Sequence, residues 1–210
     1  MYDIIKYLSI LTPLTGIIIG FKKEVFKSFI FSRIFLFLII SFISDVIAYI
    51  AARLFQNNMP IFHIYGLVEV LLILFFYKRI FPNTKLYPLL IIGFTIIYVG
   101  NTVFFEPILS FNQFGQGIKC ITAIIAVMYY YYRLIINSSD TIYNKSYFYI
   151  SVGIVLYYSV SIYSYLFAIV LHNYETETRF NIWIIHNSLN ILKNLFIAYG
   201  FWNIQTNVKN

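Results

Sequence analysis

Several amide and ionisable side chains of this sequence lie inside long apolar runs, where a bilayer makes them costly and therefore functional candidates. His186, Asn190 and Lys193 recur at i, i+4 and i+7, so they share one face of a helix. Asn187 and Asn194 flank this stripe. Because lipid tails cannot satisfy such a face, we expect it to meet other helices or water.

Two acids, Asp45 and Glu69, lie in other apolar runs. A rise of 1.5 Å per helical residue places Glu69 about 12 Å from one end of its helix. The same estimate brings residues of several helices into one half of the membrane, so we expect Lys193 to pair with Glu69 or Asp45. A ligand site and a purely structural ion pair both remain open. The predicted polar cluster consists of Asp45, Glu69, Asn101, His186, Asn187, Asn190 and Lys193.

The composition indicates that this cluster is set in a membrane protein. Of 210 residues, 60% are hydrophobic and 11% charged, against about 25% charged in soluble domains. A soluble fold of this composition would expose large apolar areas, which soluble monomers avoid. We therefore predict a single integral membrane domain over residues 1–210.

Apolar runs of about 20 residues, each long enough to cross the hydrocarbon core, predict an all-α bundle of about seven transmembrane helices. The start of the chain lacks the basic region of a signal peptide, so we expect the first helix to be retained. Pro13 should kink that helix. The predicted helices are 4–20, 29–52, 61–81, 86–105, 117–136, 147–171 and 181–202.

Basic residues predict the orientation. One set of connections and the C-terminal tail hold nine lysines and arginines, whereas the opposite set holds three. We therefore expect the N-terminus outside and the C-terminus in the cytoplasm of a bacterial inner membrane. The first set is Lys22, Lys23, Lys27, Lys78, Arg79, Lys85, Arg133, Lys145 and Lys209, and the second is Arg53, Lys119 and Arg179.

Two further patterns concern helix packing. The segments 27–31 and 145–149 are similar, and His63 and His186 lie near corresponding helix ends, which suggests a 3+1+3 internal repeat like those of small transporters. Small residues spaced four apart let helices approach closely. They form two stripes, Thr12, Gly16 and Gly20 on the first helix and Ser44, Ala48 and Ala52 on the second.

Other classes of function find less support. The net charge of +7 is spread over connections, which argues against nucleic-acid binding. Cys120 is the single cysteine, and His63, His172 and His186 lack zinc-site spacing, so we expect no metal or cofactor. No His-Glu-x-x-His or Gly-x-Ser-x-Gly motif indicates an enzyme, although Asp45 and Glu69 could form an acid pair.

The polar cluster favours a small-ligand site, in a transporter or in a sensor that signals through a partner protein. Lys193 and Glu69 also resemble the retinal lysine and helix-three acid of microbial rhodopsins. Leu189, however, stands where that family has an aspartate four residues before the lysine, so retinal is not expected. A fourth alternative is an accessory protein that acts through oligomer or partner contacts.

Two segments carry a wider resemblance. The run from His63 to Glu69, followed by Asn112, and the run from Trp183 to Leu192 resemble uncharacterised small multi-pass membrane proteins of Bacteroidetes-type bacteria. The size and character of the chain also resemble multi-pass accessory proteins of type VI CRISPR loci. That second resemblance implies a membrane-embedded modulator of a defence system.

Overall fold

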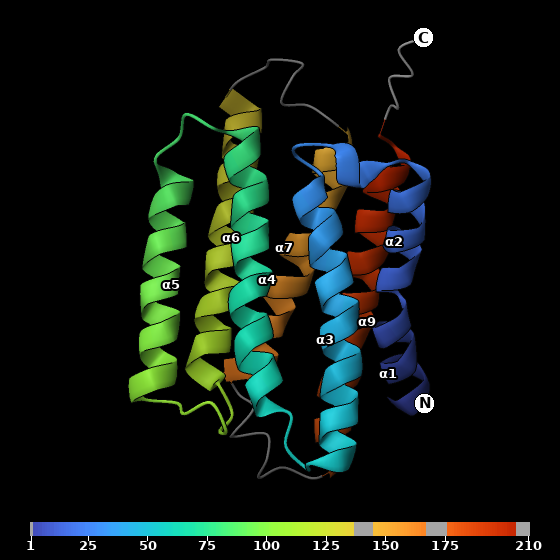
Figure 1. Ribbon diagram of the computed structural model, residues 1–210, viewed down its shortest axis with the longest axis vertical. Coiled ribbons are helices and arrows are strands. Elements are labelled where there is room, and N and C mark those ends of the chain that lie inside the picture. Colours follow the sequence, from blue (N-terminus) through green and yellow to red (C-terminus); the bar gives the residue numbers. More distant parts are fainter. Residues whose placement is uncertain (1, 137–144, 167–175, 205–210) are drawn as a thin grey trace.

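The computed structural model describes residues 2–136, 145–166 and 176–204, and within these residues the fold is all-helical. Seven long rods stand side by side in a bundle (Figure 1), the first of them being α1 and α2 together. The helices are α1 (Tyr2–Leu11), α2 (Pro13–Lys22), the short 3-10 helix η1 (Val25–Lys27), α3 (Ser32–Leu54), α4 (Met59–Ile80), α5 (Leu86–Phe104), α6 (Gln113–Ile136), α7 (Lys145–Leu166) and α9 (Thr176–Trp202).

Six of these rods are long and apolar enough to cross a membrane: α1 with α2, then α3, α4, α5, α6 and α7. The seventh, α9, is long enough but carries His186, Lys193 and several asparagines, which reduce its apolar character. The described residues therefore confirm an all-helical bundle in which six helical segments, against about seven predicted, are suited to cross a membrane. The polar residues that set α9 apart must be shielded by the other helices.

The first span is interrupted where the sequence predicts a kink. Pro13 begins α2, and a proline cannot donate a hydrogen bond to the preceding turn. The hydroxyl of Thr12 donates instead to the carbonyls of Leu8, at 2.7 Å, and Ser9, at 3.0 Å. The helix is therefore interrupted between Leu11 and Pro13, and α1 and α2 together form one candidate span.

Successive rods alternate in direction (Figure 1), so the bundle has two ends. We call the end with the N-terminus, residues 55–58 and residues 105–112 the N-terminal end. The opposite end, with residues 23–31, residues 81–85 and the end of α9, is the C-terminal end. An odd number of rods leaves the two termini at opposite ends.

Helix boundaries agree with the prediction except at a few ends. Helix α9 begins at Thr176 rather than 181, and residues 167–171 of the predicted sixth helix lie outside the described residues. The important difference is α6, which begins at Gln113 rather than 117. The prediction placed Lys119 at the outer end of that helix and counted it with the adjoining connection, whereas in the structure it lies a further turn inside α6 and only 2% of this residue is exposed. Counting Lys119 among the basic residues of the connections was therefore wrong.

The C-terminal half of the bundle is filled by aromatic side chains. Tyr77, Tyr87 and Tyr130 are fully buried, and the rings of Tyr77 and Tyr87 stack with centroids 5.9 Å apart. The hydroxyl of Tyr77 bonds Ser151 at 2.7 Å, so its polar end is satisfied inside the core. Leucines and isoleucines instead cover the outer surface, as a lipid-facing bundle requires.

Close helix contacts rely on glycines. A Cβ on Gly16 would lie 2.5 Å from Leu38 Cδ1, and one on Gly20 would lie 2.5 Å from the ring of Phe35, so this stripe faces α3. Gly153 has the same role between α7 and α9, which pack together most extensively. A Cβ there would lie 2.8 Å from Phe196 Cβ and 3.0 Å from the carbonyl oxygen of Lys193.

We expect Gly153→Ala to destabilise the bundle by roughly 1–3 kcal/mol, because the new methyl group would push α7 away from the α9 backbone. Gly93→Ala is the matched control, since nothing lies within 4 Å of a Cβ at that helical position. The control should be neutral or stabilising by up to about 1 kcal/mol, because alanine favours a helix. Thermal unfolding of the purified proteins in detergent measures both, and equal effects would contradict the packing assignment.

Candidate functional site

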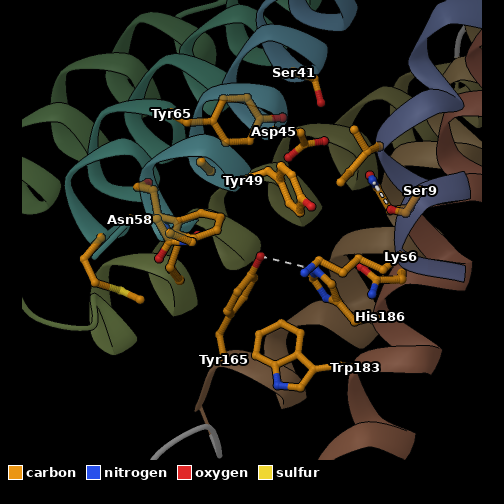
Figure 2. Close-up of a pocket in the computed structure, with 18 of the residues that line it drawn as sticks. Lys6, Ser9, Ser41, Asp45, Tyr49, Asn58, Tyr65, Tyr165, Trp183 and His186 are labelled. Carbon is orange, nitrogen blue, oxygen red and sulfur yellow. Dashed lines mark hydrogen bonds between the residues drawn. The ribbon is translucent and has the colours of Figure 1, made fainter. Parts of the chain in front are cut away.

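The N-terminal half of the bundle contains a cavity of about 350 Å³. Its walls come from α1, α3, α4, α6, α7 and α9, and Asn58 and Phe111 line it from the connections at the N-terminal end. Figure 2 shows polar and aromatic side chains pointing into this space. Its volume is at the lower end of the range of small-molecule sites, about 300–1,000 Å³.

Three charged side chains meet at the inner end of the cavity, and each is almost fully buried. The Nζ of Lys119 donates to Glu69 Oε2 at 2.9 Å, and the Nζ of Lys193 lies 3.9 Å from Glu69 Oε1. These residues belong to α6, α4 and α9. One carboxylate therefore joins three helices that are distant in sequence.

Aromatic rings cover the two lysines. The Nζ of Lys193 lies 4.1 Å from the ring centroid of Tyr157 and 5.0 Å from that of Phe37. The Nζ of Lys119 lies 4.9 Å from the ring centroid of Tyr165. Such rings attract cations through their electron-rich faces, so both ammonium groups have favourable partners besides Glu69.

His186 stands on the cavity wall within a second polar group. Its Nδ1 is 3.2 Å from the hydroxyl of Ser161, and its Nε2 is 3.4 Å from Tyr157 and 3.5 Å from Tyr165. The ring of Trp183 packs edge-on against it. Asn190, one turn further along α9, donates to Ser9 on α1 at 2.8 Å. The polar stripe of α9 thus faces α1 and α7.

A third group of polar residues connects α4, α5 and α6 at the N-terminal end of the bundle. The Asn112 side-chain amide lies 3.0 Å from both the Tyr98 hydroxyl and His63 Nδ1. Asn101 donates to Asn112 at 3.2 Å and to Glu106 at 2.7 Å. Glu106 also accepts from the first backbone N–H groups of α6, which is the favoured place for a carboxylate. This network, which we call the Asn112 network, fixes residues 105–112 against the helices.

The structure brings most of the predicted cluster together. Asp45, His186, Asn187 and Asn190 line the cavity, and Glu69 and Lys193 lie beneath it. Asn101 instead belongs to the Asn112 network, of which Asn112 lines the cavity and Asn101 does not. Of the second small-residue stripe, Ala48 and Ala52 line the cavity.

Sequence reasoning missed Lys119, the closer partner of Glu69, and the cavity-lining amides Asn112 and Gln116. Gln116 and Lys119 lie one turn apart on the same face of α6. That spacing was visible in the sequence, but the helix was expected to start only at 117. An earlier helix start is the signal that would have identified both residues.

Comparisons with known proteins add no relationship: the chain matches no protein-family model, no curated protein and no solved structure. The function must therefore be argued from the site itself. Among the described residues, no group of three or more histidines, cysteines, aspartates or glutamates is arranged to hold a metal ion. The arrangement offers an aromatic-walled space, with several polar side chains on its walls, next to a buried ion cluster.

Glu69→Gln should lower the free energy of unfolding by about 3–5 kcal/mol, because it leaves two buried ammonium groups without their carboxylate. Adding Lys119→Met should recover more of this loss than adding Lys193→Met, since Lys119 is the closer partner. Reversible unfolding in mixed micelles measures the three variants. Glu24→Gln, in an exposed ion pair with Lys27, is the matched control and should change little. Equal recovery by both double variants would contradict the unequal pairing.

Asn112→Ala should destabilise the protein by roughly 1–3 kcal/mol, because it leaves buried partners such as Tyr98 and His63 with unmet hydrogen bonds. Proteolysis of detergent-solubilised protein should become faster within residues 105–112, which Asn112 holds in place. The control is Asn83→Ala, at an exposed position in the opposite connection. If both variants are equally stable and equally resistant, the Asn112 network has no fixing role.

Proposed function

We propose that this membrane protein binds a small polar ligand in the cavity of its N-terminal half, for transport or for sensing. The observation that carries the proposal is the cavity itself, which is lined by apolar and aromatic surface with several polar side chains and reaches from the end connections to the Glu69 cluster. A purely structural ion pair would not need a space of about 350 Å³ beside it. Packed helices normally leave few voids larger than a water molecule.

The two halves of the bundle support access from one end. Cavity-lining residues include Asn58 and Phe111 at the N-terminal end, whereas buried tyrosines such as Tyr77, Tyr87 and Tyr130 fill the opposite half. A ligand would therefore enter and leave through the N-terminal end in this conformation. Such a site suits a receptor, or one of the two states of an alternating-access transporter.

Basic residues support an outward-facing N-terminal end. The C-terminal end carries Lys22, Lys23 and Lys27, together with further lysines and arginines around residues 78–85. At the N-terminal end, the count of basic residues loses Lys119, because it is buried, and gains Lys6 of α1. The bias toward the C-terminal end persists, so we propose that this end faces the cytoplasm.

The test is ligand-induced stabilisation against a panel of amino acids, organic amines, carboxylates and sugars. A ligand that binds only the folded state stabilises it, by about 2.7 kcal/mol at 100 times its Kd. At least one class should raise the Tm of the wild type. Ala48→Phe, which fills the cavity, should abolish that rise, whereas the matched Ile47→Phe on the lipid-facing side should keep it.

No rise with any class, or an equal rise in Ala48→Phe, would contradict ligand binding in the cavity. The folded state of Ala48→Phe is checked by its own melting transition without ligand. Uptake of the stabilising compound into vesicles that contain the protein then distinguishes transport from sensing. A transporter accumulates it above protein-free vesicles, and a sensor does not.

A further inference from the structure

The charges that a ligand would meet in the cavity are not the charges that are most deeply buried. Neither Glu69 nor Lys193 lines the cavity, because both lie behind its wall. Lys119 lines it, but its ammonium group is already bonded to Glu69 and covered by the ring of Tyr165. The remaining charged groups on the wall are Asp45 and Lys6.

Asp45 is the acidic side chain that faces the cavity. Within the described part of the chain, its carboxylate has no hydrogen bond or ion pair. The opposite charge that acts on it most strongly is Lys193, whose ammonium group is enclosed by Tyr157, Phe37 and Glu69. Lys193 therefore acts from behind the wall, and the cavity side of the Asp45 carboxylate is open to a ligand.

Aromatic rings surround this carboxylate. Tyr49 is one helical turn from Asp45 on α3, so the two side chains share a face. Tyr65 reaches the same cavity wall from α4. In Figure 2 the Asp45 carboxylate stands beside both rings, with Trp183 and Tyr165 on a further wall. A carboxylate among aromatic faces is the environment that binds ammonium groups.

The Tyr49 ring already attracts cations of the protein itself. The Nζ of Lys6 lies 5.6 Å from its centroid, and the guanidinium carbon of Arg53 lies 5.5 Å away. Lys6 is on the cavity wall, so its ammonium group competes with a ligand for the same ring. Lys6 should therefore weaken the binding of a cationic ligand, whereas it should strengthen the binding of an anionic or zwitterionic ligand.

We propose that the ligand is a small organic ammonium compound, with its cation against Asp45, Tyr49 and Tyr65 and its polar remainder toward Asn187 and Asn190. This inference rests on the proposed function, namely that the cavity binds a ligand. The side-chain amides offer donors and acceptors for hydroxyl or carbonyl groups. The half-buried carboxyl group of Asp45 and the tyrosine rings then select the positive charge.

The probes are choline, tetramethylammonium, putrescine and the neutral analogue of choline in which a tert-butyl group replaces the trimethylammonium group. The neutral analogue has nearly the same shape, so it isolates the contribution of charge. Ligand-dependent shifts in Tm of the purified full chain give the affinities. At least one cationic probe should bind, and the neutral analogue should bind at least about tenfold more weakly than choline, since each tenfold in affinity needs only a modest difference in contact energy.

Three variants sharpen the test. Asp45→Asn should weaken the cationic probe by about tenfold or more, while Lys6→Gln should leave its affinity unchanged or increase it. Asp3→Asn is the matched control, since it makes the same change at an exposed position of α1 outside the cavity. If Asp45→Asn fails to fold, Tyr49→Leu takes its place and should weaken the cationic probe but not the neutral analogue.

The inference is overturned if no cationic probe binds, if the neutral analogue binds as tightly as choline, or if Lys6→Gln abolishes binding. These failures are separable from failure of the proposed function. An acid or a sugar that stabilises the wild type but not Ala48→Phe would keep the cavity as a ligand site and refute its selectivity for ammonium compounds. Absence of any stabilising compound would refute both.

Discussion

The bundle depends on one carboxylate, Glu69, that serves two buried lysines. An ionised group placed in hydrocarbon without a partner is strongly unfavourable, so the charges of α4, α6 and α9 must stay together once the helices have inserted. Lys119 takes the hydrogen-bonded position and Lys193 the longer one. Apolar packing alone would leave these helices free to slide, because lipid tails solvate leucine and isoleucine as well as neighbouring helices do. The ion cluster therefore fixes their relative depth.

That constraint divides the bundle into two unlike halves. Toward the C-terminal end, buried tyrosines and phenylalanines pack together, and the hydroxyl of Tyr77 bonds Ser151 inside the core. Toward the N-terminal end, polar residues from many helices surround open space. The Asn112 network holds the connection between α5 and α6 at the rim of this space. The packed half and the hydrogen-bonded rim preorganise the cavity walls in this conformation, which favours selective binding.

Much of this arrangement follows from the sequence. Long apolar runs specify the helices because each must satisfy its own backbone in lipid, and Pro13 specifies the break between α1 and α2. The periodicity of His186, Asn190 and Lys193 gives the buried face of α9. The pairing of Lys119 with Glu69 was not predicted, because a lysine near an expected helix end usually reaches the interface and its partner is 50 residues away in the sequence. Asn101 was placed in the wrong group for a different reason. Its depth in the membrane could be estimated from the sequence, but which side of its helix faces the cavity could not. The internal repeat stays a prediction.

Burial also separates two roles that the sequence alone could not distinguish. Lys193 looks like the ligand-binding residue because an intramembrane lysine is so unusual, yet it is walled in by Tyr157, Phe37 and Glu69. Asp45 is less conspicuous, and it faces the open space. A charge that holds helices together needs full enclosure, since water would weaken its attraction. A charge that binds a ligand needs one open side, so the more accessible residue of this cluster is the better candidate for recognition.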